Sequence, residues 1–527
     1  MSPLLILALF LPWQSQPSPK CSLSGTVVDS VTGEPLNKVD LRLEPLNREA
    51  THEAVTQSDG EGRFALVDLD PGSYHLTGSR NGYFEMSYGA RRPDSDGSVM
   101  RLESGQSLNG ISLKLTPSAV ISGTVRDSDG EPLEGAHVIL ASLIYRYGRP
   151  QVQGSDSTDT DDRGEYRFRG LAAGKYYVGV EPKSYGWDRV DHSASAGPSE
   201  TSVPTVYPGV TDIGTATPIE VSAGRRVTGT DITLLRSRVF RVSGQVVNAP
   251  AARRLTLILS DAKNAGVRGF SLQTPTKDAA GNFEFRGVPP GSYELTVADQ
   301  SLQGKTAVAV GASDLKDIRV TLTPGAEIRL RIVTEGAGKP DVSGIRFALT
   351  ANGRGGFGPM PWEGDKLTAR NVPPDHYVLG LGGLPREAYV KSARTGETDV
   401  LSDGLTVTGA GTIEIAIAVA SDGGAVQGMV RDKNQQPVPG ATILLAPEGR
   451  SRANLFKSTT SDQNGHYEFA TIAPGNYKLF AWEDVEPNAW EDSDFLKDYE
   501  KLGEKVVLDP GAQAGVDLHL AILPDPQ

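Results

Sequence analysis

The stretch SGTVRDSDGEPLEGAHVIL, residues 122–140, and its continuation TDDRGEYRFRGLAAGKYYVGV, residues 160–180, decide the fold of this chain. Short runs rich in Val, Ile, Tyr and Phe alternate there with Asp/Gly/Pro turns, and helical periodicity is almost absent. Tyr166 and Phe168 are two residues apart, which places both rings on one face of a strand. About six or seven short strands joined by such turns predict an antiparallel β-sandwich.

The same pattern recurs along the chain. Each copy has a glycine-led strand opening, a Gly-x-aromatic turn about 40 residues later, and a final Gly-x-Tyr step that follows Pro or Ala. The openings contain Gly25, Gly123, Gly244 and Gly428; the turns Gly62, Gly164, Gly281 and Gly465; the final steps Gly72, Gly174, Gly291 and Gly475. The turn glycines are 102, 117 and 184 residues apart. The long last interval predicts a divergent copy between 324 and 422, where residues 372–377 keep a Pro-x-x-Tyr shape.

This period predicts an all-β chain built as a tandem array of about five Greek-key β-sandwiches, each large enough for a modest core. The expected division is a signal peptide at 1–20 and sandwiches at 21–118, 119–237 (with a long insertion), 238–323, 324–422 (divergent) and 423–527.

The recurring residues have structural explanations. Gly72, Gly174, Gly291 and Gly475 are expected to adopt positive φ in a tight turn, which other residues resist. The Tyr two positions later is expected to bury its ring while its hydroxyl finds a backbone partner. These positions therefore predict architecture and no chemistry.

With these residues in view, the repeats resemble the carboxypeptidase regulatory-like (prealbumin-like) β-sandwich, a relative of the Cna B-type and transthyretin-like modules. The matching pattern is clearest from Gly123 to Tyr176 and from Gly428 to Tyr477. Such modules occur as accessory domains beside peptidases and as stalks in surface adhesins. They are superfamily neighbours of starch-binding domains. The resemblance implies a secreted or cell-surface, non-catalytic protein with a carbohydrate-binding-like fold.

No catalytic constellation is evident in the sequence. The 7 histidines are scattered along the chain without an H-E-x-x-H motif, and no G-x-S-x-G elbow is present. We therefore expect neither an enzyme nor a cofactor. Asp-rich turns such as residues 159–162 leave incidental calcium open as an alternative to ordinary turn chemistry.

The amino-terminal segment, the net charge and the cysteine content indicate the cellular compartment and the class of partner. Residues 3–13 form an apolar run that is too short to span a bilayer and is typical of a secretory signal. No later stretch predicts an integral membrane segment. The net charge of −13 argues against a nucleic-acid partner. Cys21 is the only cysteine, which excludes an intrachain disulfide and leaves an incidental thiol or a lipidation site.

Aromatic residues gather in the segments that differ most between copies. We select as candidate ligand-binding residues Tyr185, Trp187, Tyr207, Trp482, Trp490 and Tyr499. Aromatic faces flanked by Asp, Glu and Arg suit carbohydrate. The alternative is packing, with Ser493 capping a short helix whose Phe495, Leu496 and Tyr499 face the sheet.

Three functions stay open at this point. The first is a secreted, extracellular or periplasmic binding protein with carbohydrate as the leading ligand. The second is a structural stalk or protein-interaction array whose partner is a cell-surface protein. The third is an accessory subunit of an extracellular enzyme. Exposed tryptophan rings favour the first and buried rings the second.

Overall fold

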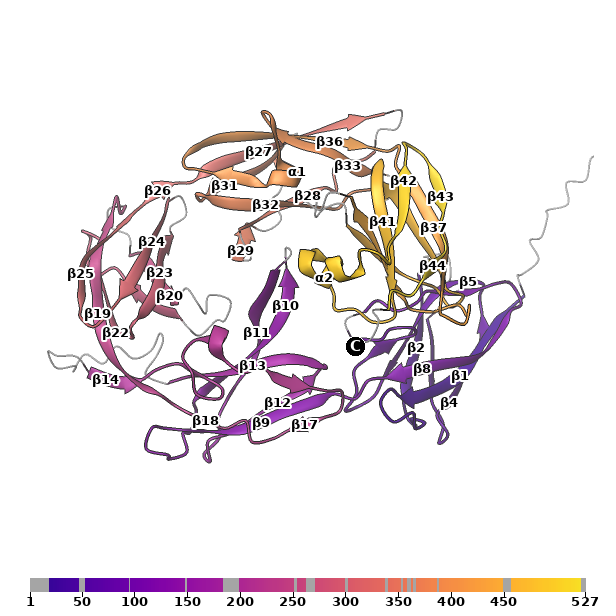
Figure 1. Cartoon of the computed structure of the whole chain (residues 1–527), viewed down its shortest axis with the longest axis horizontal. Helices are drawn as coiled ribbons and strands as arrows, with labels where there is room; N and C mark the ends of the chain where they lie inside the picture. The colour runs from indigo at the N-terminus through magenta and orange to yellow at the C-terminus, as the bar shows by residue number, and fades with distance from the viewer. Residues whose placement is uncertain are drawn as a thin grey trace, which may run out of the picture. The chain divides into compact units, whose positions relative to one another are not determined.

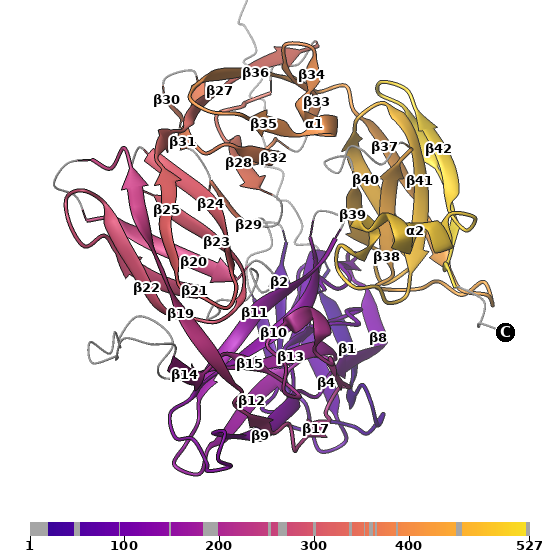
Figure 2. The same cartoon turned by 60° about the vertical axis from the view of Figure 1, so that its left-hand side comes forward.

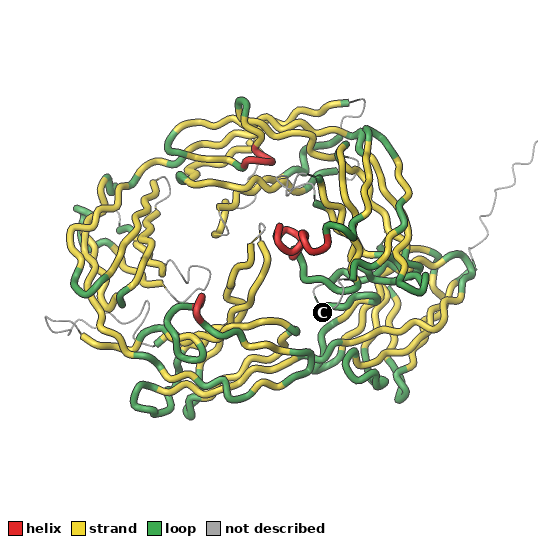
Figure 3. The backbone as a smooth tube through the Cα atoms, viewed as in Figure 1, coloured by secondary structure: helices red, strands yellow, loops and turns green. Residues whose placement is uncertain are grey.

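The computed structural model is almost entirely β-structure, and the all-β, tandem-sandwich prediction is confirmed (Figures 1 and 3). It describes residues 19–46, 53–93, 95–146, 149–182, 199–250, 254–261, 271–298, 302–336, 340–351, 354–357, 362–363, 366–385, 388–448 and 456–522. Residues up to Thr116 form one compact unit, and those from Pro117 onward form a second. The domain limits given above stay a prediction.

The first unit is a single two-layered sandwich. Its first sheet contains β1 (Cys21–Asp29), β4 (Arg63–Leu69) and β8 (Ser107–Leu115). Its second sheet contains β2 (Asp40–Pro45), β3 (Ala54–Gln57), β5 (Gly72–Ser79), β6 (Met86–Ser87) and β7 (Met100–Leu102). Alternate residues such as Leu41 and Leu43 point inward and are buried, while Asp40 and Arg42 point outward.

The second unit begins with two sandwiches of the same plan. The second sandwich pairs β9 (Ala119–Arg126), β12 (Glu165–Leu171), β17 (Arg226–Val227) and β18 (Ile232–Thr233) against β10 (His137–Arg146), β11 (Arg149–Asp159), β13 (Gly174–Glu181), β15 (Thr205–Val206) and β16 (Ile219–Val221), with η1 at Ile213–Thr215. The third pairs β14 (Ser199–Ser202), β19 (Arg236–Val247), β22 (Asn282–Val288) and β25 (Leu315–Thr321) against β20 (Thr256–Asp261), β21 (Ser271–Pro275), β23 (Gly291–Ala298), β24 (Leu302–Val310) and β26 (Thr323–Pro324). Figure 2 shows β19, β22 and β25 of the third sandwich as one layer and β20, β23 and β24 as the other.

The last two sandwiches vary the plan. The fourth has β27 (Ala326–Glu335), β30 (Trp362–Glu363), β31 (Lys366–Val372), β33 (Tyr389–Thr395), β34 (Thr398–Asp399) and β36 (Gly411–Ala420) in one sheet, and β28 (Arg346–Ala351), β29 (Arg354–Phe357), β32 (Asp375–Gly382) and β35 (Leu405–Val407) in the other, with α1 at Val400–Asp403. The fifth has β37 (Gly424–Arg431), β40 (His466–Ile472), β43 (Gln513–Gly515) and β44 (Leu518–His519) packed on β38 (Thr442–Pro447), β39 (Lys457–Thr460), β41 (Gly475–Trp482) and β42 (Glu504–Leu508), with η3 (Ala489–Glu491) and α2 (Ser493–Tyr499). Each sandwich has its own cluster of buried apolar side chains.

The Tyr of the final step behaves as predicted. In each sandwich its hydroxyl donates to the carbonyl four residues earlier: Tyr74 to Asp70 (2.7 Å), Tyr176 to Ala172 (3.0 Å), Tyr293 to Pro289 (2.9 Å), Tyr377 to Pro373 (3.0 Å) and Tyr477 to Ala473 (2.7 Å). This bond closes the turn between the two sheets.

The prediction of a positive φ at the glycine before that Tyr is wrong. Gly72, Gly174 and Gly291 do not have positive φ, and the φ of 159° at Gly475 is close to extended. The Tyr ring instead lies over the glycine, so that a Cβ on Gly291 would be 3.2 Å from the Tyr293 ring. Positive φ occurs at the preceding turn glycines: Gly62, Gly164, Gly281 and Gly465, with φ of 74°, 73°, 79° and 77°.

Candidate functional site

In every sandwich the strand that opens it lies next to the closing strand of the same sheet and runs parallel to it. In the third sandwich these are β19 and β25, since β14 comes from the segment before β15 and the two-residue β26 belongs to the other sheet. The pairs are β1 with β8, β9 with β17 and β18, β19 with β25, β27 with β36, and β37 with β43 and β44. The sequence predicts antiparallel pairing, which holds for the neighbouring strands. We call each parallel pair a terminal-strand pair.

The glycine-led openings exist because of this pair. An ideal Cβ on Gly25, Gly123, Gly244 or Gly428 would lie 2.0, 2.0, 1.9 or 1.8 Å from the carbonyl oxygen of Ile111, Thr230, Ile318 or Val516, respectively. Ile111 and Ile318 are in β8 and β25, whereas Thr230 and Val516 lie in the short breaks between β17 and β18 and between β43 and β44. Real Cβ atoms do not approach backbone that closely. Glycine therefore lets the last strand lie directly against the first.

Side chains tie the two terminal strands together. Asp231 Oδ1 accepts hydrogen bonds from the backbone N (2.8 Å) and the Oγ1 (2.9 Å) of Thr124, and Asp517 Oδ1 accepts from the N of Met429 at 3.0 Å. The buried hydroxyl of Tyr166 donates to the Thr230 carbonyl at 2.6 Å. Burial raises the pKa of the Tyr166 hydroxyl far above its usual range, so it stays a donor.

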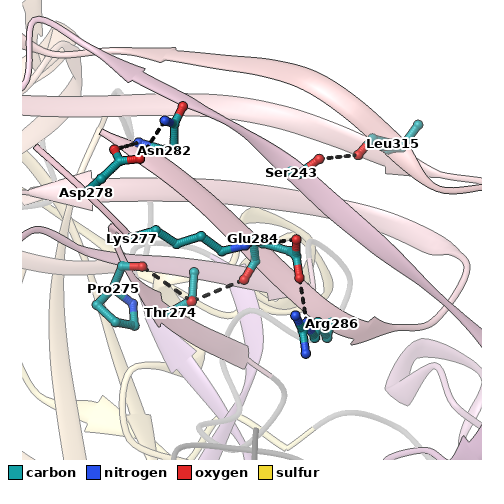
Figure 4. Close-up of polar contacts among 9 residues, drawn as sticks. All are labelled: Ser243, Thr274, Pro275, Lys277, Asp278, Asn282, Glu284, Arg286 and Leu315. Atoms are coloured by element: carbon teal, nitrogen blue, oxygen red, sulfur yellow. Dashed lines mark hydrogen bonds and ion pairs between the residues drawn. The ribbon is translucent and has the colours of Figure 1, made fainter. Parts of the chain in front are cut away.

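Figure 4 shows polar contacts of the third sandwich, both at its terminal-strand pair and at the turn before β22. Ser243 Oγ donates to the Leu315 carbonyl at 3.3 Å, joining β19 to β25. On the turn before β22, Asp278 Oδ1 accepts from the N of Ala280 (3.0 Å) and of Asn282 (3.1 Å). These bonds lower the pKa of Asp278, with the Asn282 side chain as the largest cause.

Most Asp-rich turns use the same arrangement. The carboxylates of Asp59, Asp161 and Asp462 each accept backbone N–H groups two and four residues later. In each turn one carboxylate oxygen therefore orders the backbone through hydrogen bonds. This is the ordinary turn role that the sequence left open as the alternative to calcium binding. Among the described residues no three His, Cys, Asp or Glu side chains are placed to hold a metal ion together.

Two candidate tryptophans meet on the outer face of the fifth sandwich: Trp482 belongs to β41, and Trp490 belongs to η3, which packs over that face together with α2. Trp482 is 3% exposed and Trp490 is 8% exposed. The Trp482 ring stacks on Phe480 (5.5 Å between centroids) and on Trp490 (6.4 Å). The Trp482 ring thus packs among other aromatic rings, as the packing alternative expects.

Tyr499 completes this cluster. It is half-buried, and its ring lies edge-on to Trp482 at 5.5 Å. Leu496 is buried and Phe495 packs against the same cluster, so α2 faces the sheet as the packing alternative describes. The cap predicted at Ser493 is wrong, because the side chain of Asp492 caps the helix through the N of Asp494 at 2.9 Å.

The candidates in the second sandwich are divided. Tyr207 is half-buried and packs against the core of that sandwich. Tyr185 and Trp187 lie outside the described residues. The assignment of all six aromatics to ligand binding stays a prediction.

The single thiol, Cys21, is buried in the first sandwich. It is the first residue of β1 and is 2% exposed, and its Sγ donates to the Glu103 carbonyl at 3.0 Å.

Glu181 in the second sandwich and Lys457 in the fifth also have shifted pKa values. Burial raises the pKa of Glu181 to about 7, opposed by the neighbouring His137 across the strand. Burial lowers the pKa of Lys457, whose Nζ donates to the Ala470 and Thr471 carbonyls at 3.0 and 2.6 Å. They lie in different sandwiches and do not form an acid–base pair.

One feature was not found from the sequence. The outer face of the first sandwich is hollowed between β3, β2 and β5, with Asp40, Arg42, Gln57 and Thr77 in its lining. The alternation of polar residues along 40–44 is the signal for an exposed face, but it does not reveal a hollow.

No helix in the described part of the chain has the length and apolar character needed to cross a membrane.

The sequence profile of the carboxypeptidase regulatory-like domain matches residues 22–115, 120–207 and 425–521. The inverse autotransporter adhesin YeeJ of Escherichia coli (strain K12) is 21% identical over 433 residues, which cover 78% of this chain and 17% of that protein. The chain thus spans about a sixth of that relative.

Solved structures with some similarity include two pilins. The minor pilin GBS52 of Streptococcus agalactiae is 13% identical and covers 40% of this chain and 94% of its own, with a TM-score of 0.22. The major pilin subunit BcpA of Bacillus cereus is 10% identical and covers 57% and 99%, with a TM-score of 0.15.

Proposed function

The chain belongs to the carboxypeptidase regulatory-like domain family, and from this membership we propose that it is a non-catalytic, surface-exposed array with a structural and adhesive role. The terminal-strand pairs are the observation that carries the proposal. When a chain is pulled at both ends, the tension enters each sandwich through its first strand and leaves through its last. Because these strands lie side by side and parallel, the tension shears their hydrogen bonds together instead of opening them one at a time.

The bonds across the terminal-strand pairs support a load-bearing role. In the first sandwich, Ser24 Oγ donates to Asn109 Oδ1 at 2.7 Å, in addition to the backbone ladder from Ser22 to Asp29. In the fourth sandwich the ladder pairs ten consecutive positions, from Ala326 with Gly411 to Glu335 with Ala420. Such pairing resists shear along its whole length.

Stretching single molecules of the full chain tests this role. We expect separate force peaks, each followed by a gain in contour length of roughly 30–40 nm as one sandwich unravels. Smooth extension at low force would contradict it. Thr124→Ala should lower the force of one peak, because it removes the hydroxyl bond to Asp231, and Thr77→Ala, away from any terminal-strand pair, is the matched control.

Carbohydrate is the ligand class we propose for the adhesive role. Its support is the family resemblance and the aromatic insertions; the adhesin relative supports adhesion but specifies no ligand. The burial of Trp482 and Trp490 favours the structural role for those two rings, which leaves other surfaces to contact a ligand. A pull-down of the full chain on insoluble polysaccharides tests the ligand class, and no retention on any polysaccharide would refute it.

Surface exposure is proposed from the apolar run at 3–13 and from the adhesin relative. Antibody labelling of intact cells that express the chain should detect it without permeabilisation. Signal that appears only after permeabilisation would contradict the proposal.

A further inference from the structure

The second sheet of a sandwich has an outer face, which points away from the core and which the five copies treat differently. In the fifth sandwich this face carries Phe480 and Trp482 and is covered by Trp490 and Leu496. In the second it carries Ile139, Ala141 and Val206, and Ile213 of η1 packs over them. In both cases an apolar outer face is closed by a segment of the same sandwich.

The first sandwich has a polar outer face that is hollowed instead. Six side chains form two rows across β3, β2 and β5. The strand registers place Gln57, Asp40 and Ser79 in one row and Val55, Arg42 and Thr77 in the next. These residues line a hollow of about 560 Å³, and Glu85 lines it as well. We call this feature the outer hollow of the first sandwich.

The side chains of the outer hollow are held in place by their own contacts. Gln57 Nε2 donates to Asp40 Oδ1 at 2.9 Å, and Arg42 Nε is 3.1 Å from Glu53 Oε1. These bonds fix the direction of an amide, a carboxylate and a guanidinium side by side. A ligand therefore meets oriented donors and acceptors, which reduces the ordering cost of binding.

The spacing of the outer hollow limits the shape of its ligand. Neighbouring strands are about 4.8 Å apart, and residues two apart on one strand are about 7 Å apart. Hydrogen-bonding groups are thus repeated at a spacing comparable with the width of one sugar ring. Hydroxyl, amide and carboxylate groups all pair with sugar hydroxyls, which both donate and accept. Val55, which is 67% exposed, offers an apolar patch for ring C–H groups.

The charge of the outer hollow limits the ligand further. Asp40, Glu85 and the nearby Glu44 and Glu53 outnumber the single cation Arg42, which is already within 3.5 Å of Glu44 and 3.1 Å of Glu53. An anionic ligand would be repelled by these carboxylates. A peptide would find few apolar side chains in this lining to anchor its own.

We propose that the outer hollow of the first sandwich binds a neutral saccharide chain. The inference rests on the proposed adhesive function with carbohydrate as its ligand class, and it assigns that ligand to a site away from the aromatic insertions. Gln57, Asp40 and Ser79 contact one sugar unit, and Val55, Arg42 and Thr77 contact the next.

Calorimetric titration of the full chain tests the site. The probes are cellotetraose, maltotetraose and chitotetraose as neutral oligosaccharides and tetragalacturonate as the anionic comparison. The Asp40→Ala/Gln57→Ala double variant removes two of the three groups of one row. We expect at least one neutral probe to bind, and the double variant to bind it about tenfold or more weakly.

A matched control comes from the third sandwich. Gln273 and Thr296 flank Ile258 at equivalent positions of β21, β23 and β20. The Gln273→Ala/Thr296→Ala variant should bind like the unchanged chain. Thermal unfolding of every variant checks folding, and the isosteric Thr77→Val replaces the double variant should that one unfold.

Three results would overturn the site. They are no binding of any neutral probe, tighter binding of tetragalacturonate, and equal affinity of the Asp40→Ala/Gln57→Ala variant while it remains folded. In the last case the chain still binds saccharide, so the proposed ligand class survives and only the location fails. The structural role is judged separately by the force peaks.

Discussion

Replacing Gly428 by Ala should disrupt the terminal-strand pair of the fifth sandwich. The added Cβ would lie 1.8 Å from the carbonyl oxygen of Val516, so the last strand has to move away by more than an ångström. That movement breaks the 2.7 Å bond from the Tyr467 hydroxyl to the same carbonyl and the 3.0 Å bond from Met429 N to Asp517. Losing these bonds, which are partly buried or exposed, costs about 1–2 kcal/mol, and an overpacked site costs about 1–3 kcal/mol. The change should destabilise the fifth sandwich by about 2–4 kcal/mol, even after the small gain from a stiffer unfolded chain.

Hydrogen exchange followed by mass spectrometry is the suitable assay, because a chain of several sandwiches does not unfold in one step. Amides of residues 424–431 and 513–519 should exchange about 30 to 1,000 times faster in Gly428→Ala, while those of the first sandwich keep their rates. The matched control is Gly515→Ala in β43, since a Cβ there meets nothing within 4 Å and φ is not positive. Equal exchange in the two variants would refute the explanation of the glycine-led openings.

Three further results are expected from the described contacts. The buried Cys21 should react slowly with a thiol reagent in the native chain and quickly in denaturant, and fast native labelling would contradict its place in the core. Glu181 has a pKa raised to about 7 in the folded chain, so the native state holds its proton more tightly than the unfolded state does. The second sandwich should therefore lose stability as pH rises from about 4.5 to 7. Hydrogen-exchange rates in that sandwich should rise over this pH range, and Glu181→Gln should abolish the pH dependence. Trp490→Ala removes a ring stacked on Trp482 and should destabilise the fifth sandwich by about 3 kcal/mol; unchanged exchange of β41 would contradict the packing role.

The sequence was sufficient for the hydrogen bond of the repeated Tyr, which depends on neighbours in the chain. The hydroxyl partner of Tyr74 lies four residues away, at Asp70, and the repeat with its turn residues shows that local arrangement. The role of Gly25 could not be found in this way, because the carbonyl that forbids its Cβ belongs to Ile111. Contacts between distant residues depend on register, which the strand pattern alone does not determine.

The candidate ligand site shows the same limit. Trp482 and Trp490 are aromatic and flanked by acids, as ring-stacking sites are, but η3 and α2 fold back over the sheet and bring their rings together. The outer hollow lies on residues whose composition resembles any exposed strand. Only the registers that place Asp40 between Gln57 and Ser79 reveal a group of side chains.

The divergent fourth sandwich shows that the glycine and the aromatic of the repeat are one feature. In the other copies the glycine faces an aromatic on the neighbouring strand: Gly25 with Phe64, Gly123 with Tyr166, Gly244 with Phe283, and Gly428 with Tyr467. The ladder of the first sandwich also shifts register between Leu23 and Gly25, as a bulge does, and this brings the Ile111 carbonyl over the glycine. In the fourth sandwich the ladder from Ala326 to Glu335 has no shift, and Leu330 faces Leu367 at the matching place. Because this ladder has no bulge, no carbonyl of β36 lies over the position of Leu330 in β27, and a side chain fits at that position. No aromatic ring has to pack over a glycine. The missing motif therefore follows from an unbroken ladder, and it leaves the terminal-strand pair intact.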